Sequence, residues 1–192
     1  MKDILNDYRS SLIMEIQKID PLEFQKAIHI LLDAYREDKQ IFIVGNGGSA
    51  GTANHFACDF GKNAIPWNQR RYRIHSLCDN IEVITALGND IAFDQIFSFQ
   101  LGNLMRSGDV LICISASGSS PNIVNACSYA KDHGGKIIVL SGFGGGKIAK
   151  YADSKLVTNI DTYERIEDLH LIILHMIVYW HKENANKRRY KI

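Results

Sequence analysis

Two short apolar runs are each followed at once by a loop rich in glycine and serine, and each loop opens into a helical pattern. The run 41–44 leads into Gly45-Asn46-Gly47-Gly48-Ser49-Ala50, and the run 110–114 leads into Ser115-Ala116-Ser117-Gly118-Ser119-Ser120-Pro121. A strand that passes through a tight loop into a helix is the repeating unit of a parallel sheet. The pattern therefore predicts an α/β fold.

The rest of the chain repeats this alternation. Apolar runs predict five strands, at 41–44, 72–77, 110–114, 136–140 and 155–157, and amphipathic stretches between them predict helices. We expect a doubly wound five-stranded parallel sheet of the flavodoxin-like class, with helices on both faces. Ligands of such sheets bind at the carboxyl ends of the strands, near the topological switch point.

Residues 1–38 contain two amphipathic helical patterns before the first strand. The apolar positions of the first pattern recur three and four residues apart: Leu5, Tyr8, Leu12, Ile16 and Ile19. We expect the two helices to form an antiparallel hairpin, whose first helix packs on this domain or on a partner subunit. With an α/β core over 39–183 and a basic tail over 184–192, the 192 residues form one domain.

Composition and charge limit the class of partner. The formal net charge is +1 at pH 7, so the chain lacks the strong positive field of a protein that binds nucleic acid or an anionic membrane. The basic run 187–191 is short and is typical of a solvated tail. No apolar run reaches membrane-spanning length and no secretory apolar segment opens the chain. We expect a cytoplasmic protein with no nucleic-acid or membrane partner.

Both loops predict a site for a phosphorylated small molecule. Glycine lets the backbone approach a ligand, serine donates hydroxyl groups, and the helix N-termini that follow add free N–H groups. We expect Ser115, Ser117 and Ser120 to bind the anion. The alternative is that Ser120 caps the helix and the other serines line a turn.

The first loop also fits the G-x-G-x-x-A fingerprint of a dinucleotide site, from Gly45 to Ala50. That site requires an acidic residue about 20 positions later, at the end of the second strand, and Asp79 comes too late. Neither loop ends in the Lys-Ser/Thr pair of a nucleotide P-loop. The sequence therefore favours a phosphosugar site without a nucleotide cofactor over a dehydrogenase.

Two predicted helices carry a further set of candidate residues. His55 and Asp59 are four residues apart, and Glu167 and His175 are eight apart, so each pair shares a helix face. Two histidines and two carboxylates suit a divalent metal or an acid/base pair, and solvated helix faces are the alternative. Asn89-Asp90 lies between two predicted helices, where it either caps them or binds sugar hydroxyls.

Together these stretches resemble the sugar isomerase (SIS) domain family, and within it the bacterial phosphoheptose isomerases, which isomerise sedoheptulose 7-phosphate. The resemblance covers almost the whole chain. It rests on Gly45–Ala50, His55-Phe56-Ala57, Ala86–Asp90, Gly108–Leu111, Ile114–Asn122, Gly145-Gly146-Lys147 and Arg165–His170 with His175.

The resemblance implies an aldose–ketose isomerase of a phosphorylated sugar, with Asp59 and His175 as its catalytic residues. The substrate-binding residues that it implies are Asn46, Gly47, Gly48, Ser49, Asn89, Asp90, Ser115, Ala116, Ser117, Ser120 and Glu167. It implies one zinc ion per active site, held by His55, Asp59, Glu167 and His175. It further implies a homotetramer with sites built from two chains, and a role in nucleotide-heptose synthesis for lipopolysaccharide or capsule.

The chain departs from this family pattern at three positions. Asp59 replaces a glutamate, Glu167 replaces a glutamine, and Ala116 replaces a threonine. The set of two histidines and two oxygen donors is kept but is more acidic, which favours a divalent cation. Because some SIS proteins bind phosphosugars or proteins without catalysis, a non-catalytic binding module is the alternative. The presence of Asp59 and His175 favours an enzyme.

Overall fold

The computed structural model describes residues 2–185 of the chain. Five parallel strands form one sheet with the order β2-β1-β3-β4-β5. The strands are β1 (Gln40–Gly45), β2 (Arg73–Ser76), β3 (Val110–Ser115), β4 (Lys136–Ser141) and β5 (Ser154–Val157). This order confirms the doubly wound sheet expected from the sequence and places the switch point between β1 and β3.

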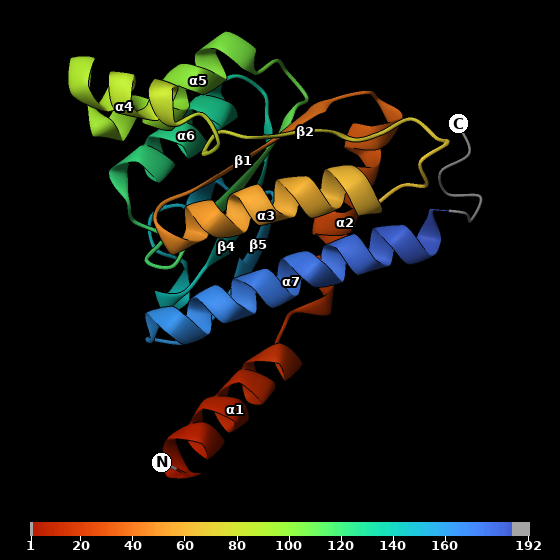
Figure 1. Cartoon of the computed structure of the whole chain (residues 1–192), viewed down its shortest axis with the longest axis vertical. Coiled ribbons are helices and arrows are strands. Elements are labelled where there is room, and N and C mark those ends of the chain that lie inside the picture. The colour runs from red at the N-terminus through yellow and green to blue at the C-terminus, as the bar shows by residue number, and fades with distance from the viewer. Residues whose placement is uncertain (1, 186–192) are drawn as a thin grey trace.

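Helices cover both faces of this sheet (Figure 1). One hydrophobic core lies under α2, α3 and α7, and a second core lies under α4, α5 and α6. The helices are α1 (Lys2–Gln17), α2 (Pro21–Arg36), α3 (Gly48–Asn63), α4 (Ile81–Asp90), α5 (Ile96–Leu104), α6 (Pro121–Asp132) and α7 (Tyr163–Asn184), with 3-10 turns η1 (Phe93–Gln95), η2 (Phe143–Gly145) and η3 (Ala149–Tyr151).

The continuous apolar run of β1 serves both cores. Ile41 and Ile43 belong to the core under α2, α3 and α7, whereas Phe42 and Val44 belong to the other core. Successive side chains of a strand point to opposite faces of the sheet, and all four are fully buried. Because helices cover both faces of the sheet, no position of this run faces solvent, and all four residues are apolar.

The two N-terminal helices are present, but they do not form the antiparallel hairpin. Instead, α1 packs on α7 and projects away from the sheet (Figure 1). The Tyr8 hydroxyl donates a hydrogen bond of 2.6 Å to Asp168, and Arg165 pairs with Asp7. The apolar stripe of α1 fits more than one partner, so its periodicity alone did not distinguish α2 from α7.

Asn89 and Asp90 form the last turn of α4 rather than a junction between two helices. Helix α4 thus continues past Gly88 to Asp90. Both side chains are exposed, and the Asn89 amide donates a 2.7 Å hydrogen bond to Asp90.

Within residues 2–185, no helix combines the length and the apolar character needed to cross a bilayer. The basic run 187–191 lies outside the described residues.

Candidate functional site

The two glycine- and serine-rich loops lie side by side at the switch point. Their strands are neighbours in the sheet, with Gly45 in register with Ile114. The side-chain amides of Asn46 and Asn122 join the loops through reciprocal hydrogen bonds of 2.9 and 2.8 Å. Asn122, which the sequence analysis did not select as a site residue, therefore fixes one loop relative to the other.

The loop after β3 is held by its own serines. Ser115 Oγ accepts a 3.1 Å hydrogen bond from the Gly118 N–H, and Ser117 Oγ accepts one of 3.2 Å from Ser119. Gly118 has a φ of +59°, and a Cβ there would collide with the carbonyl oxygen of Gly145. Only glycine allows this conformation and this close backbone approach together.

Ser120 stands at the N-cap position of α6, but its side chain makes no capping hydrogen bond. The alternative that this serine serves only as a helix cap therefore explains its position but not its hydroxyl group. In the first turn of α6, Pro121 has no N–H group, the Ile123 N–H donates to Asn122 Oδ1, and the Val124 N–H donates to the Ser120 carbonyl. The Ser120 hydroxyl therefore remains as a donor for an anion at this end of the helix.

A pocket of about 150 Å³ opens between the two loops and the start of α7. We call it the serine pocket; it is lined by Asn46, Ser49, Ile114, Ser115, Ala116, Ser117, Ser120, Tyr163 and Glu167. Tyr163 and Ile114 are additions to the predicted set. Tyr163 reaches the pocket because α7 begins there, which no local pattern of the sequence reveals.

Glu167 is the one charged side chain that lines the serine pocket. Its carboxylate lies against Gly48 so closely that a Cβ at Gly48 would collide with it. A phosphate in this pocket would therefore meet serine hydroxyl groups on one side and a carboxylate on the other.

His55, Asp59 and His175 form a second group, which we call the His–Asp–His cluster. Helices α3 and α7 run side by side and carry its members (Figure 1). Asp59 Oδ2 lies 3.2 Å from His55 Nε2 and 3.7 Å from His175 Nε2, and the two histidine Nε2 atoms are 3.4 Å apart. Two nitrogens and one oxygen converging in this way match the ligands that zinc prefers.

A family model described as "SIS domain" matches residues 6–142. The chain belongs to the SIS domain family. The matched SIS region includes both loops, His55 and Asp59, and ends before α7.

Curated relatives from this family carry the name phosphoheptose isomerase. The protein of Sulfurimonas denitrificans is 40% identical over 149 residues, which are 74% of this chain and 73% of the relative. That of Helicobacter hepaticus is 33% identical over 181 residues, covering 92% and 91% of the two chains.

Two solved structures of phosphoheptose isomerases share the fold of this chain along almost its full length. A phosphoheptose isomerase from Neisseria gonorrhoeae superposes with a TM-score of 0.86 at 30% identity, covering 95% of this chain and 98% of its own. One from Francisella tularensis gives 0.84 at 27% identity, with 94% and 97% covered. Helix α7 and the cluster therefore lie within the shared fold.

The expected SIS site residues divide into three groups in the structure. The cluster brings His55, Asp59 and His175 together, whereas Glu167 lines the serine pocket. Asn89 and Asp90 do not line this pocket. Helix α7 reaches the serine pocket within one chain, through Tyr163 and Glu167.

Proposed function

We propose that the chain is a phosphoheptose isomerase that interconverts sedoheptulose 7-phosphate and an aldose heptose 7-phosphate. The arrangement of α3 and α7 carries this proposal. Both helices begin at the serine pocket, and both carry members of the His–Asp–His cluster about two turns further along. The seven and eight residues from Gly48 to His55 and from Glu167 to His175 span about 10–12 Å of helix. An extended seven-carbon sugar with its phosphate in the pocket has its C1–C2 end toward the cluster.

The reaction moves one proton between C1 and C2 of the sugar. Asp59 removes the proton from C1 of the ketose, while His175 donates a proton to the carbonyl oxygen on C2, which gives an enediol. Asp59 then delivers a proton to C2, and His175 takes the proton from the C1 hydroxyl to form the aldehyde. Each residue ends in the protonation state in which it began.

The cluster fits a divalent metal, and zinc suits its donor set. His55, Asp59 and His175 would hold the ion, whereas Glu167, the fourth ligand that the resemblance implies, lies at the serine pocket and is not a member of the cluster. When bound, the ion supplies Lewis-acid polarisation of the substrate carbonyl. We expect about one zinc per chain in protein purified without chelator, and a loss of that metal in His55→Ala; metal content near zero in both proteins contradicts the proposal.

The decisive experiment is turnover. Purified protein is incubated with sedoheptulose 7-phosphate, with and without added zinc, and aldose formation is followed by NMR. We expect turnover in the wild type and turnover about 10³-fold slower in Asp59→Asn. If no pentose, hexose or heptose phosphate reacts while sugar phosphates still bind, the chain is the non-catalytic binding module instead.

The serine pocket is tested separately by calorimetry. We expect sedoheptulose 7-phosphate to bind far more tightly than sedoheptulose. Ser120→Ala removes a hydroxyl with no capping role, so it should lose about 1.5–3 kcal/mol of binding energy without loss of stability. Equal affinity for the two sugars contradicts a phosphate role for this loop.

We further propose a homotetramer. Four apolar side chains of α1 are more than half exposed: Ile4, Leu5, Ile13 and Met14. Light scattering that reports a monomer at micromolar concentration contradicts this assembly.

The proposed setting is the cytoplasm, where the product would feed nucleotide-heptose synthesis for lipopolysaccharide or capsule. Deletion of the gene should then shorten the surface glycan, and Asp59→Asn should fail to restore it.

A further inference from the structure

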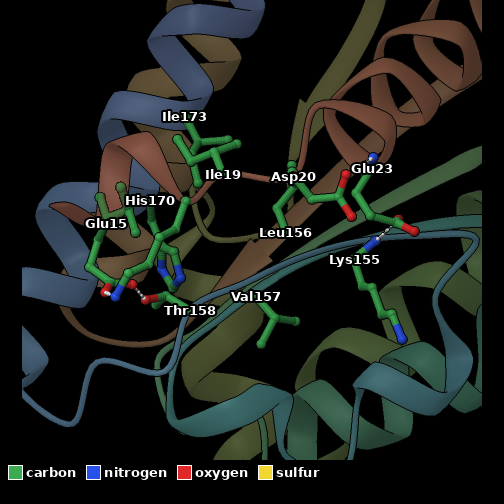
Figure 2. Close-up of a pocket in the computed structure, with 12 residues that line it drawn as sticks. Glu15, Ile19, Asp20, Glu23, Lys155, Leu156, Val157, Thr158, His170 and Ile173 are labelled. Carbon is green, nitrogen blue, oxygen red and sulfur yellow. Dashed lines mark hydrogen bonds and ion pairs between the residues drawn. The ribbon is translucent and has the colours of Figure 1, made fainter. Parts of the chain in front are cut away.

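The structure has a second pocket besides the serine pocket, and the two differ in the polar groups that they leave free. The second pocket measures about 230 Å³, lies between α1, β5 and α7, and includes His170 in its lining. Its glutamates are already engaged: Glu15 accepts a hydrogen bond from the Thr158 hydroxyl, and Glu23 accepts one from the Lys155 N–H (Figure 2). The other oxygen of each glutamate pairs with a lysine. This pocket therefore offers a ligand few free polar groups, in contrast to the serine pocket.

Asn46 brings an N–H donor to the serine pocket. In the lining that residues 2–185 supply, it is the only side chain with an N–H group, since the other polar members are serines, Tyr163 and Glu167. A hydroxyl group can donate or accept, and a carboxylate accepts, whereas a carboxamide has N–H donors on one side and a carbonyl oxygen on the other. The orientation of the Asn46 amide therefore decides whether it attracts or repels an anion.

The orientation of Asn46 depends on a residue outside the pocket. Asn122 is 2% exposed and does not belong to the pocket lining. Its Oδ1 accepts a 2.9 Å hydrogen bond from the Ile123 N–H. A flipped Asn122 amide would set its NH₂ group against that N–H, so this bond fixes the side of the amide that carries the oxygen.

Asn122 transfers this orientation to Asn46. Its Oδ1 also accepts a 2.9 Å hydrogen bond from Asn46 Nδ2, and its Nδ2 donates one of 2.8 Å to Asn46 Oδ1. A flipped Asn46 amide would set N–H against N–H and oxygen against oxygen. Asn46 Nδ2 carries two hydrogens, and Asn122 accepts one of them. The other N–H has no partner among residues 2–185 and belongs to a side chain that lines the pocket.

We propose that Asn122 is a positioning residue of the serine pocket, which orients the Asn46 carboxamide so that its free N–H donates to the phosphate of the substrate. This inference rests on the proposed binding of a sugar phosphate in that pocket. An oriented donor matters here because the Glu167 carboxylate in the same lining opposes an anion. Asn122 itself does not touch the ligand and acts through Asn46.

NMR of ¹⁵N-labelled side-chain amides tests the orientation in the wild-type protein. Inorganic phosphate and sedoheptulose 7-phosphate are the probes, and unphosphorylated sedoheptulose is the control. We expect a saturable shift of the Asn46 NH₂ signals with both phosphate probes and none with sedoheptulose. If calorimetry detects phosphate binding while these signals stay unchanged, or if neither probe binds, the proposal is wrong. An equal shift with sedoheptulose assigns the N–H to the sugar and also overturns it.

Variants separate positioning from support of the fold. Asn46→Ala should lose about 10- to 100-fold in affinity for sedoheptulose 7-phosphate, because it removes a hydrogen bond to a charged group. Asn122→Ala should lose about tenfold, and the double variant should bind no more weakly than Asn46→Ala, because Asn122 acts through Asn46. Asn125→Ala is the control on the same helix; it removes an amide that bonds to the Asp94 carbonyl oxygen and should keep the affinity. Losses that add in the double variant, or unchanged affinity in Asn122→Ala, overturn the proposal.

This test is distinct from the turnover experiment. Binding of sedoheptulose 7-phosphate with the expected Asn46 shift but without isomerisation contradicts the isomerase and supports the positioning role. Turnover with unshifted Asn46 signals contradicts the positioning role and keeps the isomerase. In an active enzyme Asn122→Ala should raise KM more than it lowers kcat, because the phosphate is remote from the reacting carbons. The wild-type titration decides the question even if Asn122→Ala does not fold.

Discussion

The serine pocket and the His–Asp–His cluster contrast in how they are built. Most of the pocket comes from two loops that follow adjacent strands, and their backbone conformation depends on nearby residues such as Gly118. The cluster joins His55 to His175 across 120 positions of sequence and depends on the packing of α3 against α7. Binding of phosphate and proton transfer should therefore be separable by mutation.

The largest expected effect is on the catalytic part alone. Asp59→Asn removes the base while it keeps the size of the side chain, so kcat should fall about 10³-fold, or about 4 kcal/mol in activation free energy. The affinity for sedoheptulose 7-phosphate, measured by calorimetry, should stay within a few-fold. Asp33→Asn, which changes an exposed carboxylate of α2, is the control. A parallel loss of affinity in Asp59→Asn would contradict the separation.

The second prediction concerns α7, which carries His175 of the cluster and also holds two buried histidines, His170 and His181. Burial lowers the pKa of His170 to about 4 and that of His181 to about 3, against about 6.5 in an unfolded chain. Below pH 6.5 the unfolded chain takes up protons that the folded chain does not, so the free energy of unfolding falls as the pH falls. Between pH 6.5 and 5 we expect a loss on the order of 2 kcal/mol per histidine.

Urea unfolding at pH 7.5, 6 and 5 measures this loss. His170→Phe should reduce the pH dependence by about one proton, whereas His29→Phe should leave it unchanged. A stability curve that is flat between pH 6.5 and 5 would contradict the buried, neutral state of both rings.

The third prediction concerns the pocket alone. Gly118→Ala forces a Cβ into the Gly145 carbonyl at a positive φ, so the loop must move. We expect a loss of about 1–3 kcal/mol of stability and weaker sugar-phosphate binding. Gly51→Ala is the matched control, because a Cβ there meets open space on α3, and it should be neutral or slightly stabilising. Unchanged phosphate affinity in Gly118→Ala would contradict the role of the loop.

The smallest effect is expected at Glu167, which lines the serine pocket and lies on the same helix as His175 of the cluster. Glu167→Gln removes the negative charge from the serine pocket and keeps the side-chain length. Phosphate affinity should rise by about 1 kcal/mol or less, and the gain should shrink at high salt. If affinity falls instead, the carboxylate binds the sugar or the metal rather than opposing the phosphate.

The sequence was sufficient for the sheet and for the place of the serine-rich loop. The apolar runs of β1 and β3 predicted two strands that are buried on both faces, and Ser115–Pro121 follows β3 and lines a pocket. Both features depend on neighbouring residues; the binding of phosphate by this loop stays a prediction. The helix-face pairs His55 with Asp59 and Glu167 with His175 were also visible as spacing.

What the sequence left open depends on distant contacts. Spacing alone did not decide that His175 meets His55 and Asp59, that Glu167 lies at Gly48 instead, or that Asn46 bonds to Asn122. Nor did it show that α1 packs on α7 and that His170 lines a second pocket. Amphipathic helices carry an apolar face that fits several partners, so only the packed tertiary structure selects which polar groups come together.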